Sequence, residues 1–223
     1  MRIITPHELL PLIKPYLCPH PTIVEAGSFH GRDTRLLSTY WPQGAIHAFE
    51  PVPTIFEQLK KNTKDLSNVY HYQQALSSRC GSALFHVAEY PAKPEKACPA
   101  GSLLTPKERL RFSPIRYPKT IEVGTTTLDA WADEHRINQI DFLWLDLQGH
   151  ELSVMQAAPH MLQNVRAIFT EVEFVHAYEQ QPLHTQVCAW LASQGFVPIA
   201  QDFRDTTTWF FGNILFVKYS LLG

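Results

Sequence analysis

The stretch Thr22–Gly31 limits what this chain can fold into more than any other part of it. A short apolar run there ends in the acid Glu25, and two glycines, Gly27 and Gly31, follow before a segment with helical periodicity. The next apolar run along the chain also ends in an acid, Glu50. A strand, a glycine turn, a helix and a second strand closed by an acid are typical of the first half of a nucleotide-cofactor site.

Apolar runs and helical patterns alternate along the rest of the chain. The run Ile140–Asp146 is almost continuously apolar, as in a central parallel strand that is buried on both faces. The pattern predicts an α/β fold with a doubly wound, mostly parallel sheet, helices on both faces and a C-terminal antiparallel strand pair. Strands are predicted at 22–26, 45–50, 69–73, 82–88, 140–146, 167–172, 197–200 and 210–217. Helices are predicted at 6–17, 151–159 and 183–194, from Gly31 to the stop at Pro42–Gly44, and behind capping boxes at Thr54/Glu57 and Thr126/Asp129.

A single domain, 1–223, is expected, because this length suits one α/β unit. Residues 1–20 are predicted to form a helical cap on the sheet edge. Residues 89–118 carry six prolines and are predicted to form an irregular insertion, a flap on the substrate side. The basic residues between 107 and 119 are interpreted as a solvated face, with neutralisation of an acidic acceptor as the alternative.

Composition limits the partners and the compartment. The net charge is -2, so the high positive charge of a nucleic-acid binder is missing. The four cysteines form no Cys-x-x-Cys pair, which disfavours a zinc site or a disulfide framework. The sequence lacks a signal peptide's apolar core and a run long enough for a membrane helix. We therefore expect a soluble cytoplasmic protein without nucleic-acid or membrane partners; the oligomeric state stays open, with a homodimer among the options.

The glycine pattern distinguishes between two cofactors. A pyrophosphate-binding turn has the pattern Gly-x-Gly-x-x-Gly, whereas Glu25 and His30 stand at two of these places. An acid would repel a pyrophosphate but suits the cationic amine and sulfonium of S-adenosylmethionine (SAM). Glu50 is placed to accept hydrogen bonds from the ribose hydroxyls. The predicted cofactor-binding residues are Glu25, Gly27, Ser28, Phe29, Gly31, Glu50, Pro51, Gln74, Ala75 and Asp146.

Several segments together resemble the FkbM family of SAM-dependent methyltransferases. The resemblance spans residues 22–217 and rests on 25–31, 48–53, 75–77, 126–129, 140–151, 170–174 and 178–179. It implies the Rossmann-like, seven-stranded class I methyltransferase fold and O-methylation of a small molecule or sugar. The chain departs from the family pattern Lys-x-Asp-x-Glu-Gly-x-Glu at two places, where Trp144 replaces the lysine and Gln148 replaces the first glutamate. We interpret Trp144 as a core residue.

Methyl transfer to a hydroxyl requires a base or a metal that removes the proton. The candidates at the ends of the fourth and fifth strands are Asp146, His150, Glu171, Glu173 and His176. The first three are the predicted catalytic residues, with Asp146 as the first choice. Asp146 and Glu171 are also the candidate ligands for a Mg²⁺ ion, because hard carboxylate oxygens suit this cation.

Two other functions stay open at this point. The first is an NAD(P)-linked oxidoreductase on a similar fold, which the missing glycine triad disfavours. The second is a non-catalytic protein that binds SAM or another small ligand, for which the two departures on the fourth strand are the argument.

Overall fold

The computed structural model describes residues 1–4, 6–112 and 114–222. Its main sheet has eight strands in the order β1-β10-β11-β9-β8-β2-β3-β4, and only β11 runs against its neighbours β9 and β10. The mostly parallel sheet and the C-terminal antiparallel pair are confirmed. The sheet has one strand more than the seven expected, because the two-residue β1 joins its edge. The strands are β1 (Arg2–Ile3), β2 (Thr22–Ala26), β3 (Ala45–Phe49), β4 (Val69–Tyr72), β8 (Phe142–Leu145), β9 (Ala167–Glu173), β10 (Phe196–Gln201) and β11 (Phe211–Lys218).

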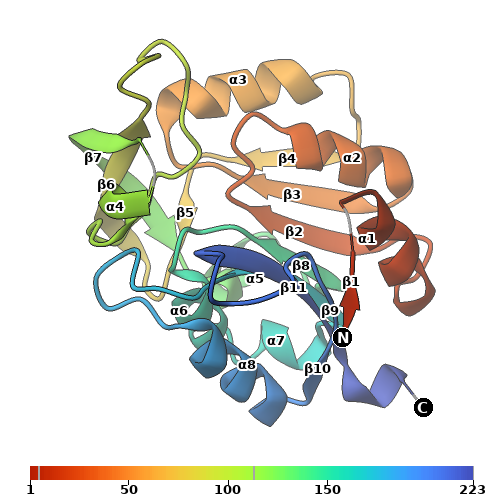
Figure 1. The fold of residues 1–223 in the computed structure, drawn as a ribbon. Helices are drawn as coiled ribbons and strands as arrows, with labels where there is room; N and C mark the ends of the chain where they lie inside the picture. The colour runs from red at the N-terminus through yellow and green to blue at the C-terminus, as the bar shows by residue number, and fades with distance from the viewer. Residues whose placement is uncertain (5, 113, 223) are drawn as a thin grey trace.

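Helices cover both faces of this sheet, as predicted (Figure 1). Apolar residues of the first three helices pack on one face and those of the last four on the other. The first group is α1 (Pro6–Ile13), α2 (Arg32–Tyr40) and α3 (Pro53–Thr63), and the second is α5 (Leu128–Glu134), α6 (Glu151–Gln156), α7 (Met161–Asn164) and α8 (His184–Ser193). Two short 3-10 helices are also present, η1 (Lys14–Tyr16) directly after α1 and η2 (Tyr219–Leu221) directly after β11. No helix in the ranges 1–4, 6–112 and 114–222 has the length and apolar character that crossing a membrane requires.

A second sheet, not predicted from the sequence, stands beside the main one (Figure 1). It consists of β5 (Ala75–Leu76), β7 (Arg116–Thr126) and β6 (Gly81–Glu89) in that spatial order. The segment 89–118, expected to be irregular, contains a short helix, α4 (Arg109–Phe112), and the start of β7 at Arg116. The proline-rich part of that segment connects the two long strands of this sheet.

Both predicted capping boxes are wrong in detail. Helix α3 begins at Pro53, with Val52 at the N-cap and no side-chain cap, since proline fits the first helical position. The cap of α5 is Thr127, whose Oγ1 accepts a hydrogen bond from the Ala130 amide at 3.1 Å. Asp129 instead accepts hydrogen bonds from the amides of His160 and Met161, and so holds the start of α7.

Candidate active site

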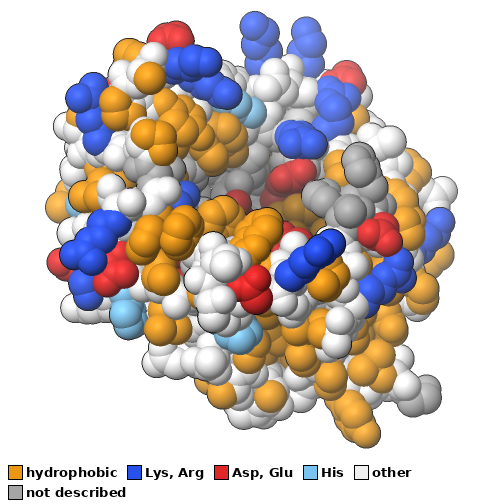
Figure 2. Space-filling view, in the orientation of Figure 1, with side chains coloured by type: hydrophobic (Ala, Val, Ile, Leu, Met, Phe, Trp, Pro, Cys, Tyr) orange, Lys and Arg blue, Asp and Glu red, His pale blue; other side chains and the backbone are white. Residues whose placement is uncertain are grey.

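A cavity of about 360 Å³ lies at the carboxyl ends of β2, β3 and β8. This is where open α/β sheets bind their ligands. In the space-filling view this face is hollowed at its centre, and acidic side chains lie inside the hollow (Figure 2). Eight of the ten residues predicted to bind the cofactor line the cavity, namely Gly27, Ser28, Phe29, Glu50, Pro51, Gln74, Ala75 and Asp146.

Glu50 forms part of the cavity wall directly after β3 and is only 5% exposed. Its Oε1 accepts a hydrogen bond from the Val52 amide at 2.8 Å, and its Oε2 accepts one from the Phe29 amide at 3.2 Å. Burial raises the pKa of Glu50 to about 7, although both backbone hydrogen bonds lower it. The carboxylate is therefore fixed in place, and each oxygen keeps a lone pair for a ligand hydroxyl.

Glu25 does not line the cavity, which corrects its assignment to the cofactor. It points from β2 into the α2 side of the sheet, where its carboxylate accepts a hydrogen bond from the Thr34 hydroxyl. Burial raises the pKa of Glu25 to about 8. Glu25 therefore holds the first turn of α2 against the sheet.

The two glycines are needed for packing rather than for access to a ligand. Gly27 lines the cavity with φ +86°, and a Cβ on it would lie 2.0 Å from the carbonyl oxygen of Asp146. Gly31 lies outside the cavity, which is a second correction. With φ +78° it lets α3 approach, because a Cβ there would lie 2.7 Å from Leu59.

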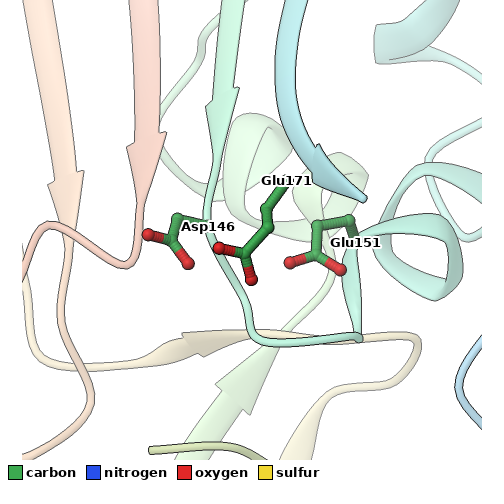
Figure 3. A group of neighbouring side chains, drawn as sticks. All are labelled: Asp146, Glu151 and Glu171. Carbon is green, nitrogen blue, oxygen red and sulfur yellow. The ribbon is translucent and has the colours of Figure 1, made fainter. Parts of the chain in front are cut away.

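Three carboxylates lie in a row, from Asp146, Glu171 and Glu151 (Figure 3), and the first of them lines this cavity. Each offers an oxygen, and these oxygens lie within 4.8 Å of one another. Glu171 comes from β9, and burial together with the charge of Asp146 raises its pKa well above the usual range. Burial also raises the pKa of Asp146, and that of Glu151 to about 7. Glu151 Oε1 accepts hydrogen bonds from the amides of Leu147 and Gly149, so this acid holds the turn before α6.

The amide of Gln148 joins two of these acids. Its Nε2 donates to Asp146 Oδ1 at 2.8 Å and to Glu171 Oε1 at 2.8 Å. The backbone of Gln148 is left-handed, with φ +52°, a conformation that few residues with side chains adopt. The two amide hydrogens are therefore shared between the carboxylates, one for each.

Two tyrosines connect this amide to the insertion. The Tyr178 hydroxyl lies 3.0 Å from Gln148 Oε1 and 3.1 Å from the carbonyl oxygen of Ala100, within segment 89–118. The Tyr117 hydroxyl donates to the same carbonyl at 2.9 Å and contacts the Tyr178 hydroxyl at 3.2 Å. Ser102 adds a hydrogen bond from its hydroxyl to the Gln148 carbonyl oxygen at 2.9 Å. The insertion is thus fastened to the acid cluster.

Arg109 is the one residue of the basic patch that contradicts the solvated-face interpretation directly. Its guanidinium lies 5.5 Å over the ring of Phe211, and its Nε is buried with no hydrogen-bond partner among the described residues. Its pKa is nevertheless raised, because Tyr178, Glu173 and Glu171 outweigh the effect of burial. Glu173 is itself 3% exposed, and burial raises its pKa to about 8. A cation from the insertion therefore lies near the buried acids.

His150 lines the cavity close to the acids. Its Nε2 lies 3.2 Å from the hydroxyl of Ser77, and its Nδ1 is buried with no partner among the described residues. Burial lowers the pKa of His150, so the ring is neutral at pH 7. A neutral ring with a free nitrogen can exchange a hydrogen bond with a ligand.

Comparison with known proteins gives the family. The family model described as the methyltransferase FkbM domain matches residues 25–198, which is well over half of the chain. The chain belongs to the FkbM methyltransferase family. The 2-O-methyltransferase NoeI of Sinorhizobium fredii is 30% identical over 164 residues, which make up 73% of this chain and 68% of NoeI. The methyltransferase sdnD of Sordaria araneosa is 25% identical over 220 residues, or 85% of this chain and 77% of sdnD.

Solved structures agree with the fold of an FkbM methyltransferase. Fibrillarin of Aeropyrum pernix, solved with natively bound S-adenosyl-L-methionine, matches with a TM-score of 0.51 at 15% identity. The match covers 95% of this chain and 74% of fibrillarin. The protein is therefore a SAM-dependent methyltransferase of class I fold, and an NAD(P)-linked oxidoreductase is not favoured.

The sequence missed one wall of the cavity of this FkbM methyltransferase. That wall comes from β6 and from the insertion, and its residues are Phe85, Val87, Ala88, Cys98, Pro99, Gly101 and Leu103. The insertion mixes prolines with small residues and has no regular apolar pattern, so its sequence did not indicate a cavity wall. The position of Gln148, two residues after Asp146, could have indicated its contact with this acid.

Proposed function

We propose that this FkbM methyltransferase transfers the methyl group of SAM to a hydroxyl of a small molecule or sugar. The observation that carries the proposal is the position of Asp146, which lines the cavity beside Glu50 and shares the Gln148 amide with Glu171. The name of the relative NoeI, a 2-O-methyltransferase, supports a hydroxyl acceptor.

Each part of the cavity has a role in this proposal. When bound, SAM would supply the methyl group as a sulfonium, and Glu50 would accept hydrogen bonds from its ribose hydroxyls. Gln74 and Ala75 would hold the adenine, and Ser28 and Phe29 would hold the amino-acid end. Glu25 and Gly31 are the two predicted cofactor-binding residues that do not line the cavity. They instead hold the turn between β2 and α2 in place, through their contacts with α2 and α3.

The acceptor proton goes to the acid pair. When the acceptor oxygen bonds to the methyl carbon, the sulfur–carbon bond breaks and the hydroxyl proton has to leave. Asp146 receives it, and Glu171, whose pKa is raised well above the usual range, shares the charge through Gln148. The neutral His150 is the second candidate base at this edge of the cavity.

The acid cluster fits a proton-accepting group better than a Mg²⁺ site. Mg²⁺ needs carboxylate oxygens free to point at it in nearly octahedral geometry. Here the amide hydrogens of Gln148 point at both Asp146 and Glu171, and Glu151 is turned to backbone amides. We therefore assign no step to a metal.

Calorimetric titration with S-adenosylhomocysteine, the stable product, tests the cofactor part of the proposal. The wild type is expected to bind with a dissociation constant in the micromolar range, and Glu50→Ala to weaken binding by roughly 10–100-fold. Glu57→Ala is the matched control, because this exposed acid on α3 forms a surface ion pair with Lys60. The absence of binding to the wild type would contradict the proposal.

Methyl transfer from labelled SAM into a metabolite extract tests the chemical part. Asp146→Asn keeps the shape of the side chain but removes the base, so label transfer should fall by about 100-fold or more. Binding of S-adenosylhomocysteine by this variant should change far less. Transfer to nitrogen rather than oxygen in the labelled product would overturn the assignment of a hydroxyl acceptor.

A further inference from the structure

A second cavity, of about 490 Å³, opens on the α1 and α2 side of the sheet. Its floor contains Trp144 from β8 and Phe169 from β9, whose rings meet edge to face with centroids 4.8 Å apart. Glu171 lies two residues after Phe169 in β9, and Asp146 lies two residues after Trp144, directly behind the end of β8. Since side chains alternate along a strand, these acids point to the same side of the sheet as the aromatic floor.

The two cavities meet at the reaction edge. Asp146, Arg32 and Asp33 line both of them. Asp146 therefore faces the cofactor on one side and the space above Trp144 on the other. A molecule in the second cavity would reach the proposed base directly. Segment 89–118 contributes to the first cavity but, among the described residues, none of its members lines the second.

The rim of the second cavity is polar and fixed. Asp202 and Asn213 lie on its edge, and the Asn213 amide groups donate to Asp202 Oδ1 at 2.7 Å and to Oδ2 at 2.8 Å. Both carboxylate oxygens keep a lone pair that can accept from a hydroxyl. Asp33 and Thr39 of α2 stand on the wall as further hydrogen-bonding groups.

We infer that the cavity above Trp144 and Phe169 is the acceptor site and takes a polyhydroxylated ring, such as a pyranose. This inference rests on the proposed methyl transfer to a hydroxyl. A pyranose has C–H groups on its faces and hydroxyls around its edge, which matches an aromatic floor inside a rim of carboxylate and amide groups.

Other acceptor classes fit less well. An anionic acceptor would meet three carboxylates on the cavity lining, from Asp33, Asp146 and Asp202. Of the two arginines on the same lining, Arg32 and Arg35, the second is already paired with Asp65. A large flat aromatic acceptor would leave the polar rim unpaired, which is costly once water is excluded. The acceptor position also changes the role of the insertion, since its residues close the cofactor cavity rather than select the acceptor.

Saturation-transfer NMR tests the inference, with saturating S-adenosylhomocysteine and a panel of methyl glycosides of glucose, galactose, mannose and rhamnose. At least one glycoside should receive saturation at its ring C–H protons, and it should also be methylated from labelled SAM. Trp144→Ala should reduce both signals by about tenfold, while the affinity for S-adenosylhomocysteine stays within about twofold. Trp209→Ala is the control, because Trp209 is 51% exposed and lines neither cavity.

A second variant keeps the inference testable if Trp144→Ala fails to fold. Leu36 lines the cavity from α2 and is 40% exposed, so Leu36→Trp narrows the space without disturbing the core. It should also abolish glycoside signals and leave cofactor binding intact. If S-adenosylhomocysteine binds but no glycoside does, or if both variants keep the glycoside signal, the inference is wrong. If S-adenosylhomocysteine fails to bind the wild type, the proposed function fails instead.

Discussion

Gly27 and Asp146 approach so closely that a Cβ on Gly27 would lie 2.0 Å from the Asp146 carbonyl oxygen. The Asp146 amide in turn donates to the carbonyl oxygen of Ala26 at 3.0 Å. The ends of β2 and β8 are thereby held together at the point where the cofactor and acceptor cavities meet. The position of the proposed base depends on this contact.

Gly27→Ala is therefore expected to lower stability by roughly 2–4 kcal/mol and to abolish binding of S-adenosylhomocysteine. Thermal unfolding and calorimetry measure the two effects. Gly81→Ala is the control, since Gly81 also has positive φ, +133°, but an added Cβ would meet nothing within 4 Å. Equal losses in the two variants would show that backbone strain, rather than the clash with Asp146, is responsible.

Glu25 predicts a specific pH dependence of stability. Its folded pKa, about 8, lies above the ordinary value of 4.5, so the folded protein holds a proton that the unfolded chain releases. The stability that this bound proton contributes is fully present below pH 4.5 and is lost as the pH rises through about 8. Glu25→Gln stays neutral and can still accept from Thr34, so its stability should exceed that of the wild type by on the order of a few kcal/mol at high pH. Unfolding curves at pH 5 and about pH 8.5 check this, and a constant difference between variant and wild type would refute it.

Gln148 predicts how the protein responds to metal ions. The wild-type melting temperature and methyl transfer should be unaffected by EDTA or millimolar Mg²⁺. Gln148→Glu would replace the shared amide by a fourth carboxylate beside Asp146, Glu171 and Glu151, and the cluster should then bind Mg²⁺. Its melting temperature should rise by a few degrees with Mg²⁺, as ligand binding to the folded state requires. Loss of wild-type activity in EDTA would contradict the assignment.

Tyr178→Phe should loosen the insertion. The substitution leaves the buried Gln148 Oε1 without its donor, which costs about 1–3 kcal/mol. It also removes one of the two tyrosine contacts to the Ala100 carbonyl oxygen. Hydrogen exchange should accelerate around residues 98–104, as the hydroxyl network no longer holds them. Tyr219→Phe, at a side chain that is 71% exposed, should leave both stability and exchange unchanged.

The main sheet could be predicted from the sequence because its strands are continuous apolar runs between clear turns. The bounds predicted for β2 agree with the structure, and the close spacing of 197–200 and 210–217 correctly indicated the antiparallel pair. The strand β6 was predicted, at 82–88, but the second sheet was missed because its partner β7 carries many exposed residues and lacks an apolar face of regular period. Their pairing depends on contacts that no local pattern encodes.

The sequence could place a site residue only where the residue directly follows a parallel strand. Glu50 and Asp146 directly follow parallel strands, so both had to lie at the same sheet edge. Glu25 lies within β2 instead, and the direction of its side chain depends on the packing of α2. Trp144 was interpreted as a core residue, and it does pack on the core, against Phe142 and Phe169. Its place in a cavity was not predicted, because that depends on how far α1 and α2 cover the sheet.

The pairing of β2 with β8 has a consequence for synthesis on the ribosome. The Thr22 amide donates to Asp141, which lies 119 residues later in the chain. The first half of the cofactor loop is therefore made long before the strand that completes it. An emerging chain that ends before β8 contains Glu50 but not Asp146, so the cofactor cavity lacks the wall that β8 supplies. The protein becomes a SAM-binding enzyme only when most of its length has left the ribosome.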